Sequence, residues 1–341
     1  MTSTTVRIGL IGAGGIAGAH VAGYKRNPET ITFAAVADPV RANAEARAEG
    51  TAAAIYADYA TMLAEADIDA VDICLPHHLH KDAIVAAARA GKHILCEKPL
   101  CVTREEADEV SAAVAESGVT LMCAHNQLFL PAVAKAKELI DSGALGRLYE
   151  VRTTDSFFND FDASTMGWRA HTATSGGGEL IDTGYHPTYL LLHLAGAAPV
   201  EVVAMLATHR LSFMEGEDSA NVMVRFDNGV IGTLATSWAY QPADGTEKFS
   251  AVGERGALTS DGTTLTFRRR GEAEATVFDL EPVHEFGEEL AHFARSILDG
   301  TRPLHTEKEG IAVLGIILGA YESARTGTVA AVARPAVATA G

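Results

Sequence analysis

The sequence predicts an α/β fold, in which a doubly wound parallel sheet is followed by a second domain of the α+β type. Up to about residue 125, short apolar runs of strand length alternate with Ala-rich helical stretches, a pattern typical of βαβ units. Beyond that point the strands are grouped, which favours an open, mostly antiparallel sheet. The first apolar run, Val6–Ile11, leads directly into a glycine-rich turn.

The first predicted domain spans residues 1–125. Its expected strands are Val6–Ile11, Thr32–Ala37, Ala70–Leu75, His93–Cys96 and Val119–Ala124. The expected helices between them are Ile16–Arg26, Arg41–Glu49, Lys81–Ala90 and Arg104–Ser117. Gly91 and Gly118 follow two of these helices, where a left-handed cap is needed. Thr103 and Glu106 have the spacing of a capping box.

The second predicted domain spans residues 126–327, and residues 328–341 are expected to form a loose tail. Its expected helices are Pro131–Ser142, Gly176–Leu194, His284–Leu298 and Glu307–Ala324. A long strand is expected over Gly146–Phe158, and further strands from Val200 to Leu280. Among the latter, Ala220–Asp227 and Val230–Trp238 alternate with period two around Asn228-Gly229, a hairpin signal.

The composition excludes several classes of function. Acidic residues outnumber basic ones by 44 to 27, and a net charge of −17 disfavours binding to nucleic acid or to anionic membranes. No apolar run is long enough to span a bilayer, and Met1–Thr5 lacks the pattern of a signal peptide. Four cysteines without framework spacing indicate reduced thiols (Cys74, Cys96, Cys101 and Cys123), so we expect a cytoplasmic protein.

The glycine-rich turn has the pattern of a dinucleotide-binding, or Rossmann, fold. Gly12, Ala13, Gly14, Gly15, Ile16 and Ala17 fit G-x-G-x-x-[GA] between the first strand and the first helix. Amides at the helix N-terminus would bind the phosphates. Asp38 ends the second predicted strand, where a carboxylate accepts hydrogen bonds from the adenosine ribose and repels a 2′-phosphate. The motif therefore predicts NAD as the cofactor in preference to NADP.

The carboxyl ends of other strands supply further candidates, because ligands gather at that edge of an open α/β sheet. Lys98 follows the fourth strand, and Pro99 restricts its backbone, so its amine is placed for acid–base chemistry. Residues expected to contact the cofactor are Leu75, Pro76, His77, His80, Glu97, Lys98 and Asn126. A zinc site with Cys96 or Cys101 is a competing interpretation, but no ligand spacing supports it and no metal site is predicted.

A third group of candidates lies in the second domain. If the segment around Gly176–His186 is helical, Asp182 and His186 share one face and can hold adjacent hydroxyls and move a proton. Pro187 complicates this interpretation, because inside a helix it would kink the axis. Trp168 and Arg169 could line a sugar pocket. The residues expected to contact substrate are Lys98, Asn126, Trp168, Arg169, Asp182 and His186.

Taken together, Gly12-x-Gly14-x-x-Ala17, Glu97-Lys98-Pro99 and Asp182-x-x-x-His186 resemble the glucose–fructose oxidoreductase/inositol dehydrogenase/rhizopine catabolism (Gfo/Idh/MocA) family. The resemblance covers the chain to about residue 325. It implies that Lys98, Asp182 and His186 meet beside the nicotinamide, that the substrate is a secondary alcohol of a sugar, inositol or related polyol, and that the chain forms homodimers or homotetramers. The sequence departs from the family pattern at His77, where Asn is common, and at Leu128, where many relatives have Arg.

We therefore expect an NAD-dependent dehydrogenase in which Lys98 and His186 handle the proton and Asp182 orients His186 or binds a neighbouring hydroxyl. Three alternatives remain open. One is a glycoside hydrolase that oxidises a hydroxyl transiently and recycles its NAD. Another is a dihydrodiol dehydrogenase or a similar reductase, for which a content of only 6% aromatic residues is low. The last is a non-catalytic NAD-binding sensor, although a sensor would need none of Lys98, Asp182 and His186.

Overall fold

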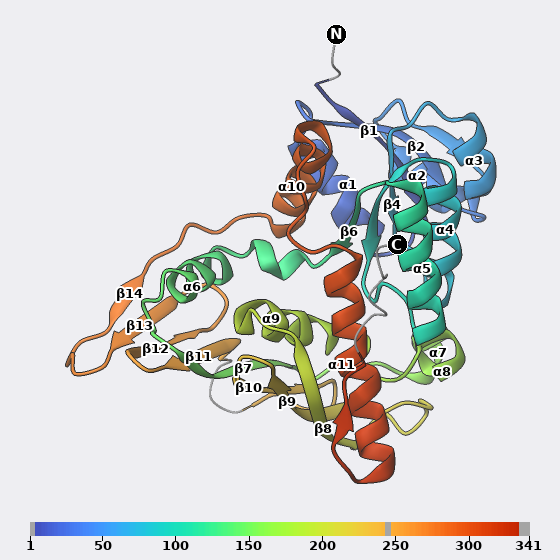
Figure 1. Ribbon diagram of the computed structural model, residues 1–341. Coiled ribbons are helices and arrows are strands. Elements are labelled where there is room, and N and C mark those ends of the chain that lie inside the picture. The colour runs from blue at the N-terminus through green and yellow to red at the C-terminus, as the bar shows by residue number, and fades with distance from the viewer. Residues whose placement is uncertain (1–3, 243–246, 334–341) are drawn as a thin grey trace. The chain divides into compact units, whose positions relative to one another are not determined.

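The computed structural model describes residues 4–242 and 247–333, which form two compact units. The first unit contains the chain up to Asn126 together with Val283–Gly310, and the second contains Gln127–Pro282 and the chain from Ile311 onward. Residues 283–310, expected in the second domain, therefore belong to the first unit. The reason is α10 (Glu285–Asp299), whose buried residues include Leu290, Phe293 and Ala294 and which packs against α1 (Ala17–Arg26) (Figure 1).

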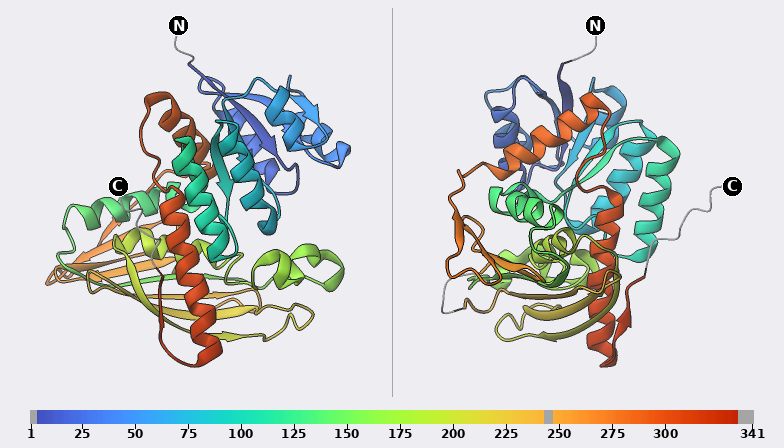
Figure 2. Two further views of the ribbon diagram at one scale, coloured as in Figure 1. Left: turned by 45° about the vertical axis from the view of Figure 1, so that its right-hand side comes forward. Right: turned by 60° about the vertical axis from the view of Figure 1, so that its left-hand side comes forward.

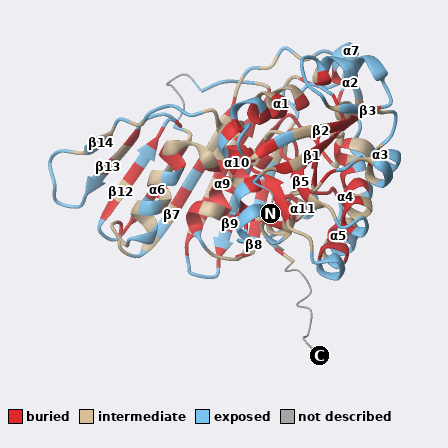
Figure 3. Cartoon of the chain, turned by 90° about the horizontal axis from the view of Figure 1, so that it is seen from above, coloured by how far each residue is buried: buried red, intermediate tan, exposed pale blue. Residues whose placement is uncertain are grey.

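The first unit is built on a six-stranded parallel sheet with the strand order β3-β2-β1-β4-β5-β6. The strands are β1 (Val6–Ile11), β2 (Ile31–Ala37), β3 (Ala54–Tyr56), β4 (Ala70–Ile73), β5 (His93–Glu97) and β6 (Leu121–Ala124). The helices are α1, α2 (Arg41–Ala48), α3 (Tyr59–Glu65), η1 (His77–Leu79), α4 (His80–Arg89), α5 (Arg104–Ser117) and α10. The expected doubly wound sheet is confirmed, and its central strands are largely buried (Figure 3).

Local signals in the sequence correspond closely to the helix ends of this unit. Gly91 and Gly118 both have φ of +68°, the left-handed conformation expected of a cap. The Thr103 hydroxyl accepts a hydrogen bond from the amide of Glu106, while the Glu106 carboxylate accepts one from the amide of Val102, one residue further back.

The elements β3 and α3 were not predicted, because a three-residue edge strand and a short helix give little periodic signal.

The second unit is built on a nine-stranded sheet with the order β14-β13-β12-β11-β7-β10-β9-β8-β15, in which only the pair β7 and β10 is parallel. The strands are β7 (Leu148–Ser156), β8 (Pro199–Ala207), β9 (Ser219–Phe226), β10 (Ile231–Ser237), β11 (Phe249–Gly253), β12 (Gly256–Ser260), β13 (Leu265–Arg269), β14 (Thr276–Phe278) and β15 (Ala330–Ala331). The expected hairpin is the turn between β9 and β10, with Gly229 at φ +87°. The expected mostly antiparallel sheet is confirmed.

Helices cover one face of this sheet, with α9 (Tyr185–Ala195) packed on β7 and β10 and α6 (Pro131–Asp141) beside α9 (Figure 2). The remaining helical segments are η2 (Asn126–Phe129), α7 (Ala163–Met166), η3 (Gly167–Ala170), α8 (Thr172–Ser175) and α11 (Glu307–Thr326), which begins in the first unit. Residues 328–333 are not a loose tail: β15 pairs with β8, and Val332 donates its amide to Val200. Residues 334–341 of the expected tail lie outside the described residues.

Candidate active site

The glycine-rich turn after β1 has the geometry that a dinucleotide requires. Gly12 has φ of +89°, and a Cβ there would lie 2.5 Å from the carbonyl oxygen of Cys74, so this position excludes a side chain. A Cβ at Gly14 or Gly15 would meet nothing within 4 Å. The turn is therefore closed toward the sheet and open outward at the start of α1, where free amides can receive a pyrophosphate. Ala13 and Ala17 are buried, and Ile16 is exposed.

Asp38 fixes the turn from the neighbouring strand. Its Oδ2 accepts the amide of Ala13 and its Oδ1 accepts the amide of Val40, both at 2.8 Å. Each carboxylate oxygen has a further lone pair that can accept a ribose hydroxyl. Arg41, by contrast, forms an exposed pair with Glu45, as a surface residue of α2 would.

Arg47 is a residue near the turn that the sequence analysis did not single out. Its guanidinium donates to the carbonyl oxygens of Gly14 at 2.7 Å and Ala13 at 3.3 Å. A cation behind these two peptide groups polarises the amides of Gly14 and Gly15 on their other side. The sequence position of Arg47, near the C-terminal end of α2, does not indicate this contact, because the contact depends on how α2 packs on the glycine turn.

The loop after β4 holds four of the expected cofactor residues. Leu75 and Pro76 are partly exposed at the carboxyl edge of the sheet, whereas His77 and His80 are buried. The ring of His80 lies between two loops, with Nδ1 2.7 Å from the carbonyl oxygen of Pro99 and Nε2 2.8 Å from that of Leu75. Its side chain therefore braces the loop. Burial lowers the pKa of His80, although the two carbonyl oxygens act in the opposite direction.

Lys98 follows β5 directly and is partly buried, and its peptide bond to Pro99 is cis. Glu97, the last residue of β5, was expected to contact the cofactor, but its carboxylate points into the protein. It lies 3.1 Å from Nε2 of His20 and accepts the amide of Lys98 at 3.0 Å. Asn126 ends the first of the two segments of this unit; it follows β6 and is buried.

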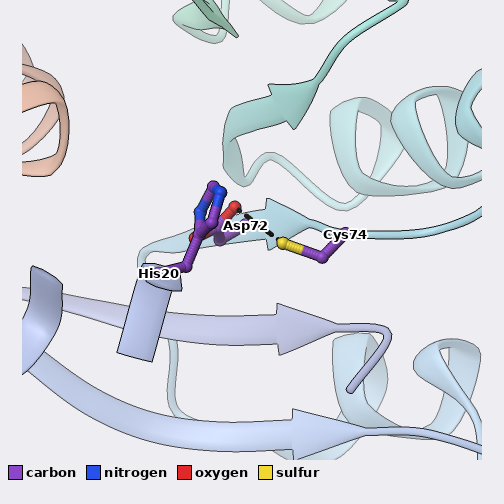
Figure 4. A group of neighbouring side chains, drawn as sticks. All are labelled: His20, Asp72 and Cys74. Carbon is purple, nitrogen blue, oxygen red and sulfur yellow. Dashed lines mark hydrogen bonds and ion pairs between the residues drawn. The ribbon is translucent and has the colours of Figure 1, made fainter. Parts of the chain in front are cut away.

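Beneath Glu97, a buried polar cluster joins α1 to β4. Figure 4 shows His20, Asp72 and Cys74 gathered there. The carboxylate of Asp72 lies 2.7 Å from Nδ1 of His20 and also accepts the Tyr24 hydroxyl at 2.5 Å. Burial, followed by the charge of Asp72, raises the pKa of the Cys74 thiol to about 12. A protonated thiol beside a carboxylate that already accepts two hydrogen bonds is an acid–base network and not a set of free metal ligands.

In the second unit, the expected helix over Gly176–Leu194 begins only at Tyr185. Asp182 lies in the preceding turn, and His186 lies in the first turn of α9. The complication raised for Pro187 does not apply, because Pro187 lies in the first turn of α9, where a backbone amide has no helical partner.

The polar candidates of the second unit have specific partners there. Asp182 is buried, and its Oδ2 lies 2.7 Å from Nε of Arg169, whose guanidinium stacks 4.3 Å from the centre of the Trp168 ring. Nδ1 of His186 lies 2.8 Å from the hydroxyl of Tyr189. That hydroxyl also accepts the amide of Gln127, at 3.1 Å. The i, i+3 spacing of His186 and Tyr189 on a helix could have indicated this pair.

Glu179, like Arg47, was not singled out from the sequence, and its side chain is buried. The Thr236 hydroxyl lies 2.8 Å from the carbonyl oxygen of Asp155, which can only accept, and it also contacts Oε1 of Glu179. The Thr236 hydroxyl is therefore shared between two acceptors. Burial raises the pKa of Glu179 well above the usual range, although the hydrogen bond from Thr236 acts in the opposite direction.

The fold and these sites define an NAD-binding oxidoreductase of two units. A family model described as an oxidoreductase family with an NAD-binding Rossmann fold matches residues 6–125, and one described as the GFO/IDH/MocA C-terminal domain matches residues 133–259. The chain belongs to the Gfo/Idh/MocA family of oxidoreductases, whose curated members include several sugar and polyol dehydrogenases.

The chain is similar over most of its length to curated relatives. It is 30% identical over 332 residues to levoglucosan dehydrogenase of Pseudarthrobacter phenanthrenivorans, covering 84% of this chain and 83% of the relative. It is 29% identical to 1,5-anhydro-D-fructose reductase of Ensifer adhaerens (95% and 98% covered) and 28% identical to scyllo-inositol 2-dehydrogenase (NAD(+)) of Bacillus subtilis (94% and 95% covered). The solved structure of levoglucosan dehydrogenase in complex with NADH superimposes with a TM-score of 0.89 at 26% identity, covering 97% of this chain and 100% of that one.

Among the described residues, no helix is both long and apolar enough to cross a membrane.

Proposed function

We propose that this protein transfers a hydride between NAD and a secondary alcohol of a sugar, inositol or related polyol, with Lys98, Asp182 and His186 acting on the substrate hydroxyls. One observation in particular supports the proposal. The glycine turn, the loop of Leu75 and Pro76, and Lys98 follow β1, β4 and β5, which are neighbours in one parallel sheet. The dinucleotide cradle and an amine therefore lie along the same edge of the first unit, as a dehydrogenase needs.

The residues would divide the chemistry as follows. NAD, when bound, would supply the hydride acceptor for the substrate carbon, and the proton of the alcohol oxygen would need a base in the protein. If Nδ1 of His186 donates its hydrogen to the Tyr189 hydroxyl, Nε2 has a lone pair and would take that proton. Asp182, which is held by Arg169, would accept a hydrogen bond from a neighbouring hydroxyl of the substrate. Lys98 would stabilise the alkoxide or share the proton, and Asn126 would contribute a polar contact to substrate or cofactor.

The test is NADH formation on a panel of levoglucosan, scyllo-inositol, D-xylose and methyl glucosides, with NADP in parallel and product release followed separately. We expect NADH to form with NAD, and little product with NADP, because the carboxylate of Asp38 would bind the adenosine ribose and repel a 2′-phosphate. Glycoside cleavage without net NADH would instead identify the cofactor-recycling hydrolase. Tight NAD binding without any turnover would identify a sensor.

Lys98→Met should keep NAD binding and lower kcat by about a hundredfold, because it removes the amine without changing the glycine turn. Lys92→Met is the matched control, since Lys92 precedes the opposite end of the same strand and donates to the carbonyl of Ile68. An equal loss of turnover in both variants, or normal turnover in Lys98→Met, would contradict the proposed role of Lys98.

A further inference from the structure

We propose that Glu97, held by His20 and Asp72, is a positioning residue for Lys98, so that a buried chain of charges in the first unit fixes the reactive amine. The inference rests on the proposed function of Lys98 and adds to it three residues that the reaction itself does not touch. They come from separate elements: His20 from α1, Asp72 from β4 and Glu97 from the end of β5.

The hydrogen bonds that link Asp72, His20 and Glu97 are continuous, and all three side chains are buried. His20 and Asp72 have no exposed surface, and Glu97 is 7% exposed. Asp72 lies 2.7 Å from one ring nitrogen of His20, and Glu97 lies 3.1 Å from the other. The second oxygen of Glu97 accepts the amide of Lys98 at 3.0 Å. Glu97 thus spans the distance between the buried imidazole and the backbone of the lysine.

The geometry also fixes the charge of His20. Both ring nitrogens face carboxylate oxygens, and only an imidazolium can donate from both. Burial by itself lowers the pKa of His20, but the charge and hydrogen bond of Asp72, together with smaller contributions from Cys74, raise that pKa well above the usual range. For the acid Glu97, burial acts to raise the pKa. The hydrogen bond and the charge of His20 act to lower it, and the pKa of Glu97 lies below the usual range. Glu97 is therefore a carboxylate whose two oxygens both accept strong hydrogen bonds.

A second buried imidazole holds the other side of the same segment. His80 lies 2.7 Å from the carbonyl oxygen of Pro99, the residue after Lys98. The backbone of Lys98 is therefore fixed on both sides, through its own amide and through Pro99. A lysine side chain is flexible, so its amine can be aimed only if the backbone that carries it is fixed. Misplacing a catalytic group by about 1 Å can cost a hundredfold in rate.

The test is a double-mutant cycle between Glu97→Gln and Lys98→Met, measured on the best substrate of the panel. Glutamine fills the same space but cannot accept from both His20 and the Lys98 amide. We expect kcat to fall about tenfold or more, with KM and the Kd for NAD changed by no more than about threefold. On the Lys98→Met background, Glu97→Gln should cause no further loss.

Three accompanying measurements keep the test decisive. Thermal unfolding shows whether Glu97→Gln is folded, and Glu97→Asp, which keeps the charge but shortens the reach, replaces it in the cycle if it is not. Hydrogen–deuterium exchange at the Lys98 amide should accelerate in both variants. His93→Gln is the matched control: His93 begins the same strand and its ring accepts the amide of Thr120, so kcat should be unchanged there.

The outcomes separate this inference from the proposed function. If folded Glu97 variants keep kcat within about twofold, or if their loss adds fully to that of Lys98→Met, Glu97 does not act through Lys98 and only this inference fails. Normal turnover in Lys98→Met would overturn the proposed role of Lys98 and this inference with it.

Discussion

Glu97 and Glu289 are two buried glutamates of the first unit with different surroundings. Glu97 accepts hydrogen bonds from His20 and from the Lys98 amide, whereas both carboxyl oxygens of Glu289 are buried without a hydrogen-bond partner among the described residues. Burial, together with the charges of Glu97 and Asp72, raises the pKa of Glu289 well above the usual range, although the charge of His20 acts in the opposite direction. Glu289 is therefore a neutral acid within a charged cluster.

Glu289→Gln should gain stability over the wild type as the pH rises. Below the ordinary pKa of a glutamate both folded and unfolded chains hold the proton, so the pH has no effect through this residue. Above it only the folded chain keeps the proton, so unfolding releases it and the wild type loses stability with rising pH. Glutamine has no such proton to release.

The measurement is the melting temperature of both proteins from about pH 5 to about pH 8, in the same buffers. The difference between Glu289→Gln and the wild type should move in favour of the variant across this range. A difference that stays constant across this range would show that Glu289 is ionised in the folded protein, because neither state would then hold the proton.

Some residues of the candidate site could be predicted because a local rule places them. Lys98 and Asp38 directly follow strands, and Gly12 stands in a motif whose turn requires a positive φ. His20, Arg47, Glu179 and Glu289 follow no such rule. Their roles depend on which helix packs against which strand, and one sequence carries no signal of that packing.

Elements with a strong period could be predicted to within a few residues, as in β1, α5 and the β9–β10 hairpin. Short or irregular ones could not: β3 and α3 were missed, and the turn carrying Asp182 was taken for part of a helix. In that turn the amides of Asp182 and Gly184 both reach the carbonyl of Glu179, a local arrangement that resembles a helix in sequence spacing alone.

The contact of α1 with α10 gives a prediction at the scale of elements. A Cβ at Gly23 would lie 2.4 Å from Cδ1 of Leu290 and 3.0 Å from the carbonyl oxygen of Phe286, so the two helices meet backbone to backbone. Gly→Ala inside a helix usually stabilises by about 0.5–1 kcal/mol. Gly23→Ala should instead destabilise by about 1–3 kcal/mol through overpacking.

The free energy of unfolding from urea titration, with NAD absent, measures this effect. The sign is decisive: a Gly23→Ala variant as stable as the wild type, or more stable, would show that α10 does not pack closely on α1.

At the scale of the whole molecule, the uncovered face of the nine-stranded sheet presents apolar side chains. Met205 is 81% exposed, Met223 48% and Val203 39%, and Val203 and Met223 are direct partners across β8 and β9. Exposed apolar side chains gathered in this way mark an interaction surface. We propose that this face joins copies of the chain into a homodimer or homotetramer.

Met205→Glu should lower the mass measured by light scattering coupled to size exclusion, because it places a charge in that surface. Val277→Glu is the control, since Val277 is 62% exposed on β14, far from β8 in the strand order. A monomeric wild type, or equal dissociation by both variants, would contradict the assignment of this face.

The return of Val283–Gly310 to the first unit has a consequence for how the protein is made. The helix that completes the NAD-binding unit is encoded after the larger segment of the second unit, Gln127–Pro282. During translation, the segment up to Asn126 therefore leaves the ribosome without α10. The surface of α1 at Gly23 is not covered by α10 until more than a hundred further residues have been synthesised. The nucleotide-binding unit is thus begun first and finished among the last, so the nascent chain acquires its complete cofactor-binding unit only near the end of synthesis.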